Sequence, residues 1–128
     1  MTQEDKELLL KDLCARLPYN FRVEYNGTTL TNIFDVLGIA HGRIILCLPF
    51  MSKTECPLIE EVKPYLFPLS SMTGEQYVEF VHLGNATSDD CFDGANFNQL
   101  DWLNAHHYDY RGLIEKSLAL DATGLNIY

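Results

Sequence analysis

The sequence predicts an α+β protein with an N-terminal helix, a mostly antiparallel sheet of three to five strands, and two further helices packed on the sheet. Apolar residues recur at helical spacing near the N-terminus and again in the second half of the chain. Between these regions, segments that alternate apolar and polar residues or are rich in β-branched residues are separated by turn residues, as in antiparallel sheets. The 128 residues contain no repeat, linker or low-complexity tract, so we expect a single domain over 1–128.

The first helix is predicted over Gln3–Arg16. Thr2 is a good N-cap, and Asp5 three residues later nearly completes a capping box. Pro18 ends the helix, because the residue before a proline disfavours helical dihedral angles. The predicted apolar face consists of Leu9, Leu10, Leu13, Cys14 and Leu17.

Three strands are predicted next. Residues 21–25 alternate apolar and polar side chains, and Asn26-Gly27 is a strong signal for a type I′ hairpin turn. The return strand covers 28–37, and a second turn covers 38–42. The third strand, 43–48, has almost no polar residue, so we expect it to be central with both faces covered.

A loop over 49–57 and a fourth strand over 58–63 are expected to follow. Pro64 and Pro68 then exclude a regular helix or a central strand, because proline lacks the backbone N–H. We expect an extended segment lying across the core instead.

The second helix is predicted to begin after Thr73, which forms a capping box with Gln76, and to end at Gly84. Its apolar stripe is Tyr77, Phe80 and Val81. A polar loop over 85–94 follows.

The third helix is predicted over about 95–107, and a short strand over 117–120. Asp109 is placed to cap a turn through Leu113. The helix face toward the core should carry Phe97, Leu100, Leu103 or Asn104, and His107, with Trp102 and Ala105 to its side.

The net charge of -9 disfavours direct binding to nucleic acid or to a membrane surface, since both require clustered lysine and arginine. Solubility explains the acidity most simply, and an acidic mimic of nucleic acid is an alternative. The longest apolar run, 44–51, is far shorter than the roughly 20 residues of a membrane span. No signal peptide is expected, and four scattered cysteines fit free thiols in the cytoplasm, with two disulfide bridges as the alternative.

The candidate ligand-binding residues are His106, His107, Asp109, Tyr110 and Arg111. Arg111 with a histidine could hold an anion, or stack on an aromatic ring and pair with a carboxylate within an Asp109-Tyr110-Arg111 network. The structural interpretation is that one histidine is a hydrogen-bonded core residue, that the other lies on the surface, and that the remaining residues tie the helix end to the sheet.

No metal site and no cofactor are predicted. Adjacent helical histidines point about 100° apart and cannot easily share an ion. Aspartates near 89–93 only partly match a calcium loop, since Leu100 occupies the position of its bidentate glutamate. The sequence has no nucleophile elbow and no phosphate-binding glycine loop, so we expect no catalytic residue.

Two stretches, 59–73 and 101–116, resemble a family of small uncharacterised proteins abundant in gut bacteria and in their phages and mobile elements. The resemblance extends to the N-terminal helix at 9–18, whereas the middle strands and the loop at 85–98 are particular to this chain. It implies a cytoplasmic accessory protein of bacterial or mobile-element origin, and it supplies no activity, cofactor or catalytic residue.

We therefore expect a non-enzymatic accessory module that binds a partner protein. The first alternative is a small enzyme or ligand-binding protein with its site at the five candidate residues, and the second is the acidic mimic. Seven tyrosines favour a groove or a homodimer contact as much as they favour ordinary half-buried positions.

Overall fold

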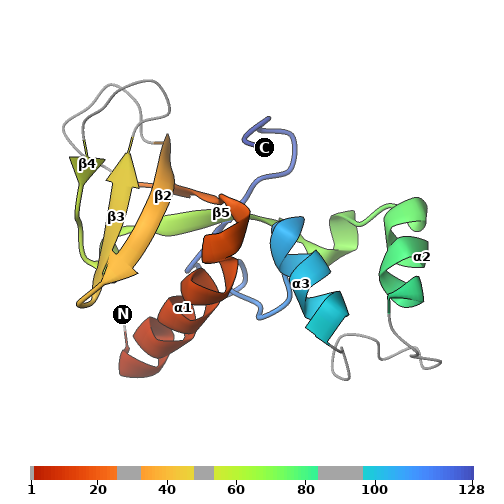
Figure 1. Cartoon of the computed structure of the whole chain (residues 1–128), viewed down its shortest axis with the longest axis horizontal. Coiled ribbons are helices and arrows are strands. Elements are labelled where there is room, and N and C mark those ends of the chain that lie inside the picture. The colour runs from red at the N-terminus through yellow and green to blue at the C-terminus, as the bar shows by residue number, and fades with distance from the viewer. Residues whose placement is uncertain (1, 26–32, 48–53, 84–96) are drawn as a thin grey trace.

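A computed structural model describes residues 2–25, 33–47, 54–83 and 97–128. It confirms the α+β class, with an N-terminal helix, a mostly antiparallel sheet and two further helices. The molecule is elongated, with β2, β3 and β4 at one end and α2 at the other (Figure 1). The predicted Asn26-Gly27 turn, the end of the second helix at Gly84 and the loop at 85–94 lie outside the described residues.

Helix α1 spans Gln3–Arg16, as predicted, and the side chain of Thr2 accepts a hydrogen bond from the Asp5 N–H at 3.1 Å. Its buried face differs from the predicted one: Leu10 and Cys14 are exposed. The buried residues are Leu9, Asp12, Leu13 and Arg16. After α1 the chain continues as a 3₁₀ turn, η1, over Leu17–Tyr19.

The described sheet has the strand order β4-β3-β2-β1-β5-β6, with β7 also paired to β5. Pairing is antiparallel from β4 to β5 and parallel where β5 meets β6 and β7. The four longer strands are β1 (Arg22–Glu24), β2 (Ile33–Ala40), β3 (Arg43–Cys47) and β5 (Lys63–Pro68). Three two-residue strands are added to them: β4 (Thr54–Glu55), β6 (Tyr108–Asp109) and β7 (Leu120–Asp121).

The exclusion of a central strand at Pro64 and Pro68 was wrong, because β5 lies between β1 and β6. The prolines are the second and last residues of β5, so the three residues between them keep their N–H groups. Phe67 donates one of these to the His107 carbonyl at 2.8 Å, and the Leu66 carbonyl accepts from Ala122 at 2.8 Å.

Other strand predictions were also wrong. The predicted turn over 38–42 is shorter, because β2 continues to Ala40 and only His41 and Gly42 form the turn. Of the predicted strand over 117–120, only Leu120 is in a strand. The expected strand at 58–63 is mostly a 3₁₀ helix, η2 (Ile59–Glu61), whose start is stabilised by the Leu58 N–H donating to the Glu61 carboxylate at 2.9 Å. Strand β3 has only one fully buried face, because Ile44 and Leu46 are buried whereas Ile45 and Cys47 are half-buried.

Helix α2 spans Gly74–His82 and has the predicted capping box between Thr73 and Gln76. A further 3₁₀ turn, η3 (Leu69–Ser71), precedes it. Of the predicted stripe, Phe80 is fully buried, Val81 is half-buried and Tyr77 is 42% exposed. In the described residues no helix is long and apolar enough to cross a membrane.

Helix α3 spans Phe97–Ala105, and its predicted core face was right for Leu103 and Asn104 but wrong for Phe97. Phe97 is 86% exposed, while Trp102 is buried with Gln99, Leu103 and Asn104. Trp102 packs against Phe80 of α2 and Tyr108 of β6. Phe97 is five residues before Trp102, about 140° around the helix, so it points away from that contact.

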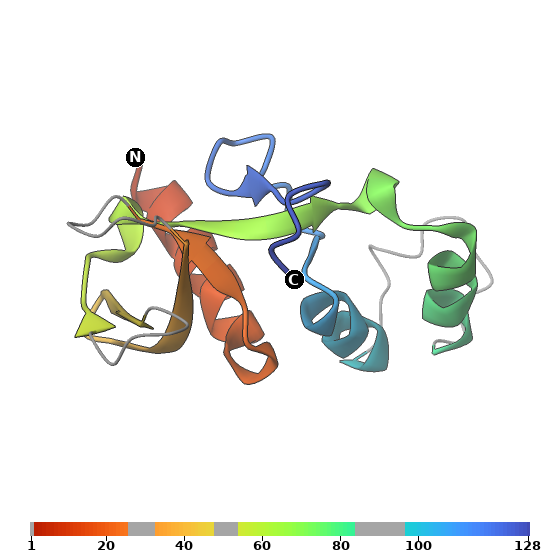
Figure 2. The same ribbon diagram turned by 90° about the horizontal axis from the view of Figure 1, so that it is seen from above.

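The helices lie on one side of β5, and the segment leading to β7 loops over the other side (Figure 2). The main hydrophobic cluster joins α1 to the inner faces of β1, β2, β3 and β5, and Leu113, Leu118 and Ala119 complete it. A second cluster, Phe80, Trp102, Leu103 and Tyr108, joins α2 and α3 to the far end of β5. The residues between α3 and β7 therefore lie where the two clusters meet.

Candidate functional site

The five predicted site residues do not form one site. His106 and His107 line a pocket of about 430 Å³. Asp109 and Tyr110 line a different pocket of about 380 Å³. Arg111 lines neither of these pockets and instead reaches α1.

His106 lies on the surface at the end of α3. Its Nδ1 is 2.9 Å from the Trp102 carbonyl oxygen, and its ring stacks on the Trp102 ring with 4.1 Å between centroids. A carbonyl oxygen can only accept a hydrogen bond, so Nδ1 carries the proton in this contact. The neutral ring therefore presents the lone pair of Nε2.

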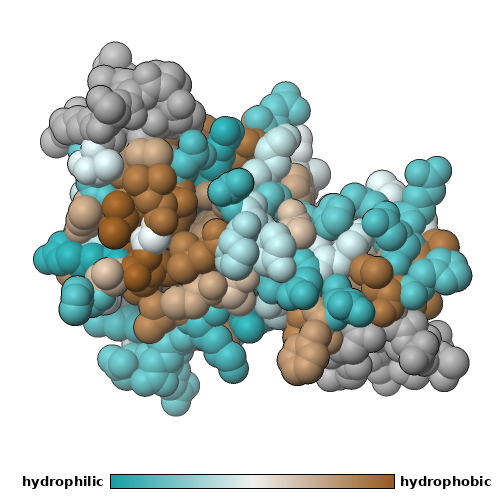
Figure 3. All heavy atoms as spheres, viewed as in Figure 1, coloured by the Kyte–Doolittle hydropathy of each residue, from teal (hydrophilic) through white to brown (hydrophobic). Residues whose placement is uncertain are grey.

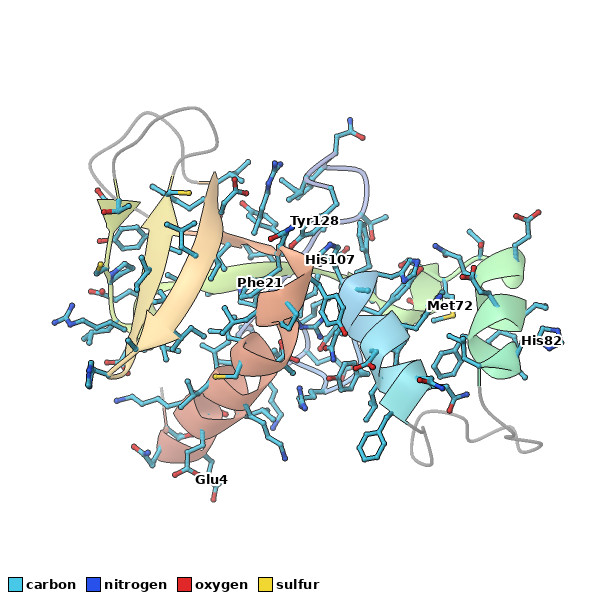
Figure 4. All side chains as sticks on the ribbon, viewed as in Figure 1. Glu4, Phe21, Met72, His82, His107 and Tyr128 are labelled. Atoms are coloured by element: carbon cyan, nitrogen blue, oxygen red, sulfur yellow. The ribbon has the colours of Figure 1, made fainter. Side chains whose placement is uncertain are left out.

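His107 is buried, at 9% exposure, and adopts a left-handed backbone conformation with φ of 63°. Its N–H donates to the Asn104 carbonyl and its own carbonyl accepts from Phe67, so the residue ends α3 and starts β6. The ring stacks on Tyr128 with 3.6 Å between centroids and 10° between planes (Figure 4). The prediction of one buried and one surface histidine is confirmed. The expected ring hydrogen bond of the buried one is not found, because Nδ1 has no partner.

The surroundings of His107 keep its ring neutral. Burial is the main cause, and the positive charge of Arg16 and the neighbouring His106 contribute, so that the pKa is lowered from 6.5 to about 4. Burial likewise raises the pKa of Tyr128 to about 12. The Tyr128 hydroxyl donates to the Tyr65 carbonyl at 2.8 Å and accepts from the Arg22 N–H at 2.9 Å. Both stacked rings are therefore uncharged at neutral pH.

Asp109 is buried and caps the turn that follows it, as predicted. Its two carboxylate oxygens accept hydrogen bonds from the N–H groups of Leu113 and Ile114, each at 2.9 Å. Gly112, within this turn, has φ of 74°. The carboxylate of Asp109 thus stabilises the backbone of its own turn.

The predicted network of Asp109, Tyr110 and Arg111 was right in its stacking and wrong in its ion pair. The Arg111 guanidinium lies over the Tyr110 ring at 4.8 Å. Its carboxylate partner is Asp12 of α1, at 3.1 Å, and not Asp109, whose oxygens face backbone N–H groups. The Tyr110 hydroxyl donates to the Asn104 side chain at 2.9 Å.

The buried ion pair behind this network was not predicted from the sequence. Asp12 and Arg16 are both fully buried, and Arg16 also donates to the Tyr108 carbonyl at 2.7 Å. Its Nη1 has no hydrogen-bond partner. A signal was available: Asp12 and Arg16 share a helical face with Leu9 and Leu13, with the i, i+3, i+4, i+7 spacing of a buried stripe.

Gln76 and Tyr128 were also not predicted as site residues, yet both line the pocket of His106 and His107. The structure describes Cys14, Cys47 and Cys56, and all three are unpaired. No cluster of three or more histidine, cysteine or carboxylate side chains within the described ranges could hold a metal ion. Cys91 and the partial calcium loop fall outside those ranges.

No protein-family model matches the sequence, and comparisons with curated proteins and with solved structures find no match.

Proposed function

We propose that the protein is a non-enzymatic accessory module that binds a partner protein through the outer face of strands β2 and β3. The observation that carries the proposal is an apolar side chain, Leu37, left 60% exposed in the middle of a sheet face. By contrast, the polar groups of Asp109, Tyr110 and Arg111 bond to other parts of the protein. The face around Leu37 therefore offers an exposed apolar side chain to a partner.

Leu37 points outward because side chains alternate along β2, and Phe34 and Val36 lie on the core side. The register shifts between Val36 and Gly38, so Leu37 has no direct partner on β3. This β-bulge places Gly38 on the outer face next to Leu37 and returns Ile39 to the core side. A Cβ built on Gly38 would lie 4.0 Å from the Ile45 side chain, which puts these two residues in contact on the same face. Leu37, Gly38, Ile45 and Cys47 form what we call the β2–β3 outer face.

Figure 3 shows hydrophobic atoms gathered over β2 and β3, with hydrophilic atoms around much of their margin. An exposed apolar area with a polar rim is typical of a protein-interaction site. The net charge of -9 favours a basic partner, since opposite charges steer the encounter and discriminate against other proteins.

The proposal places the protein in the cytoplasm as an accessory of a mobile element. The unpaired cysteines support a reducing compartment, and the likeness of 59–73 and 101–116 to small phage-associated proteins supports the origin. The acidic-mimic alternative gains little support, since the described carboxylates are spread over several elements and Asp12 and Asp109 are buried.

The test is affinity capture from the native host, using wild-type protein, Leu37→Glu and the matched control Phe97→Glu. Phe97 is equally apolar and 86% exposed, but it lies on α3. Wild type and the Phe97 variant should retain the same basic protein. With the purified partner, Leu37→Glu should weaken binding at least tenfold, and binding should weaken as salt is raised.

Loss of the partner from both variants, or from neither, would contradict the proposed face. Size-exclusion chromatography with light scattering tests the homodimer. A dimer that dissociates only with Leu37→Glu would identify a second copy of the chain as the occupant instead of a basic protein. Urea unfolding of each variant checks that the fold is retained.

A further inference from the structure

The pocket shared by His106 and His107, which we call the His107 pocket, has the size and walls of a small-molecule site. Its volume of about 430 Å³ lies within the range that small ligands occupy. Phe67, Tyr108 and Tyr128 line it together with His107, and the His107 and Tyr128 rings are stacked (Figure 4). These ring surfaces suit a planar molecule.

Gln76 directs a hydrogen-bond donor to this pocket. Its Oε1 accepts from the Thr73 N–H at 3.0 Å and from the Tyr108 hydroxyl at 2.6 Å. A backbone N–H can only donate, so the oxygen and nitrogen of the amide are assigned unambiguously. The two donors occupy Oε1, and the NH₂ group remains available for a ligand.

His107 supplies a second donor. Its enclosed Nδ1 has no partner, and the guanidinium of Arg16 lies near enough to act on the ring electrostatically. A neutral imidazole carries its proton on one ring nitrogen. With that proton on Nε2, the ring offers a hydrogen-bond donor to a ligand in the pocket that His107 lines.

The described residues that line the pocket include no aspartate, glutamate, lysine or arginine. We propose that the His107 pocket binds a small planar molecule through a carbonyl or carboxylate group, which accepts hydrogen bonds from the Gln76 amide and from Nε2–H of His107. No residue of the β2–β3 outer face lines this pocket, although Tyr128 lines both it and the neighbouring pocket at Leu37 and Cys47. The pocket adds ligand recognition to the proposed partner binding.

The test is a titration of wild-type protein with benzoate, followed by ¹H–¹⁵N NMR, with benzylammonium as a probe of similar shape and opposite charge. Benzoate at millimolar concentration should shift the signals of Gln76, His107 and their neighbours, and benzylammonium should not. The variant Gln76→Glu should bind benzoate at least tenfold more weakly, because a carboxylate replaces the NH₂ donor. Glutamate keeps the capping box and accepts from Tyr108, so the fold should be retained.

A second variant, His107→Asn, removes the imidazole N–H and should also weaken benzoate binding, while Leu37→Glu should bind benzoate as wild type does. This last variant separates failure of the pocket from failure of the proposed partner surface. If benzoate and its uncharged analogue benzamide both leave the pocket signals unchanged, or if Gln76→Glu binds benzoate as tightly as wild type, the proposal is wrong.

Discussion

Asp12 and Arg16 form an ion pair that is fully buried within the protein. Arg16 Nε and Nη2 lie 2.7 and 3.0 Å from the two carboxylate oxygens of Asp12, and both residues are 0% exposed. The pair connects α1 to β6 through the Tyr108 carbonyl and to the following turn through Arg111. Two residues on one helix face thereby hold together segments that are far apart in the chain.

Replacing one partner of this pair should be strongly destabilising, because it leaves a buried charge without its counter-ion. Asp12→Leu is expected to lower the free energy of unfolding by about 3–5 kcal/mol. The double variant Asp12→Leu/Arg16→Met should recover most of that loss, since apolar groups of similar volume can replace a buried ion pair. Urea denaturation followed by circular dichroism measures both.

The surface pair between Lys6 and Glu60 provides the control. Its atoms are 2.9 Å apart, but the two side chains are 42% and 33% exposed. Lys6→Met should therefore change the free energy of unfolding by about 1 kcal/mol or less. A loss from Asp12→Leu no larger than that from Lys6→Met would show that the buried pair contributes little.

Local features were predictable from the sequence, and long-range ones were not. The bounds of α1, its N-cap at Thr2 and the capping box of α2 depend on residues close together in the chain, and they were predicted correctly. The role of Arg16 depends on Tyr108, which is 92 positions away. Asp12 and Arg16 have the helical spacing of the buried stripe, but the predicted face of α1 included neither of them.

The error at β5 has a similar origin. A proline excludes a central strand only where its missing N–H is needed, and that depends on pairing partners. Strand β6 was not predicted, and β7 overlaps the predicted strand over 117–120 only at Leu120. Each is two residues long and pairs with β5. His107 likewise belongs to the pocket because its left-handed conformation ends α3, two residues before the predicted helix would have ended.

Two glycines should respond in opposite ways to alanine. Gly112 has φ of 74°, and a Cβ there would meet no atom within 4 Å, so the only penalty is backbone strain. Gly112→Ala should lower the free energy of unfolding by about 1 kcal/mol, the usual disadvantage of a left-handed non-glycine residue. Thermal or urea unfolding measures it.

Gly74 is the matched position, since it opens α2 and a Cβ there would also meet no atom within 4 Å. Its φ is in the range that any residue adopts, so Gly74→Ala should leave stability unchanged or raise it by up to about 1 kcal/mol. Equal effects at the two positions would mean that the turn after Asp109 does not require the left-handed conformation.

The buried imidazole of His107 should make the protein less stable in mild acid. Its pKa is about 4 in the folded protein and near 6.5 when the chain is unfolded. Between these two pH values only the unfolded chain binds the extra proton, so acid favours unfolding. The free energy of unfolding therefore has its full value above pH 6.5. It falls as the pH is lowered toward 4, by up to about 3 kcal/mol in all.

The measurement is urea denaturation from pH 7 to pH 4.5 for wild type and for His107→Asn. Asparagine tolerates the left-handed conformation and does not titrate, so the variant keeps the backbone while the imidazole is lost. The loss of the stack on Tyr128 lowers the stability of the variant at every pH, and the informative quantity is therefore the slope with pH. Below pH 6.5 the free energy of unfolding should fall more steeply for wild type than for His107→Asn. Parallel plots of this free energy against pH would show that His107 is protonated in the folded protein. Burial beside Arg16 would then not hold its ring neutral.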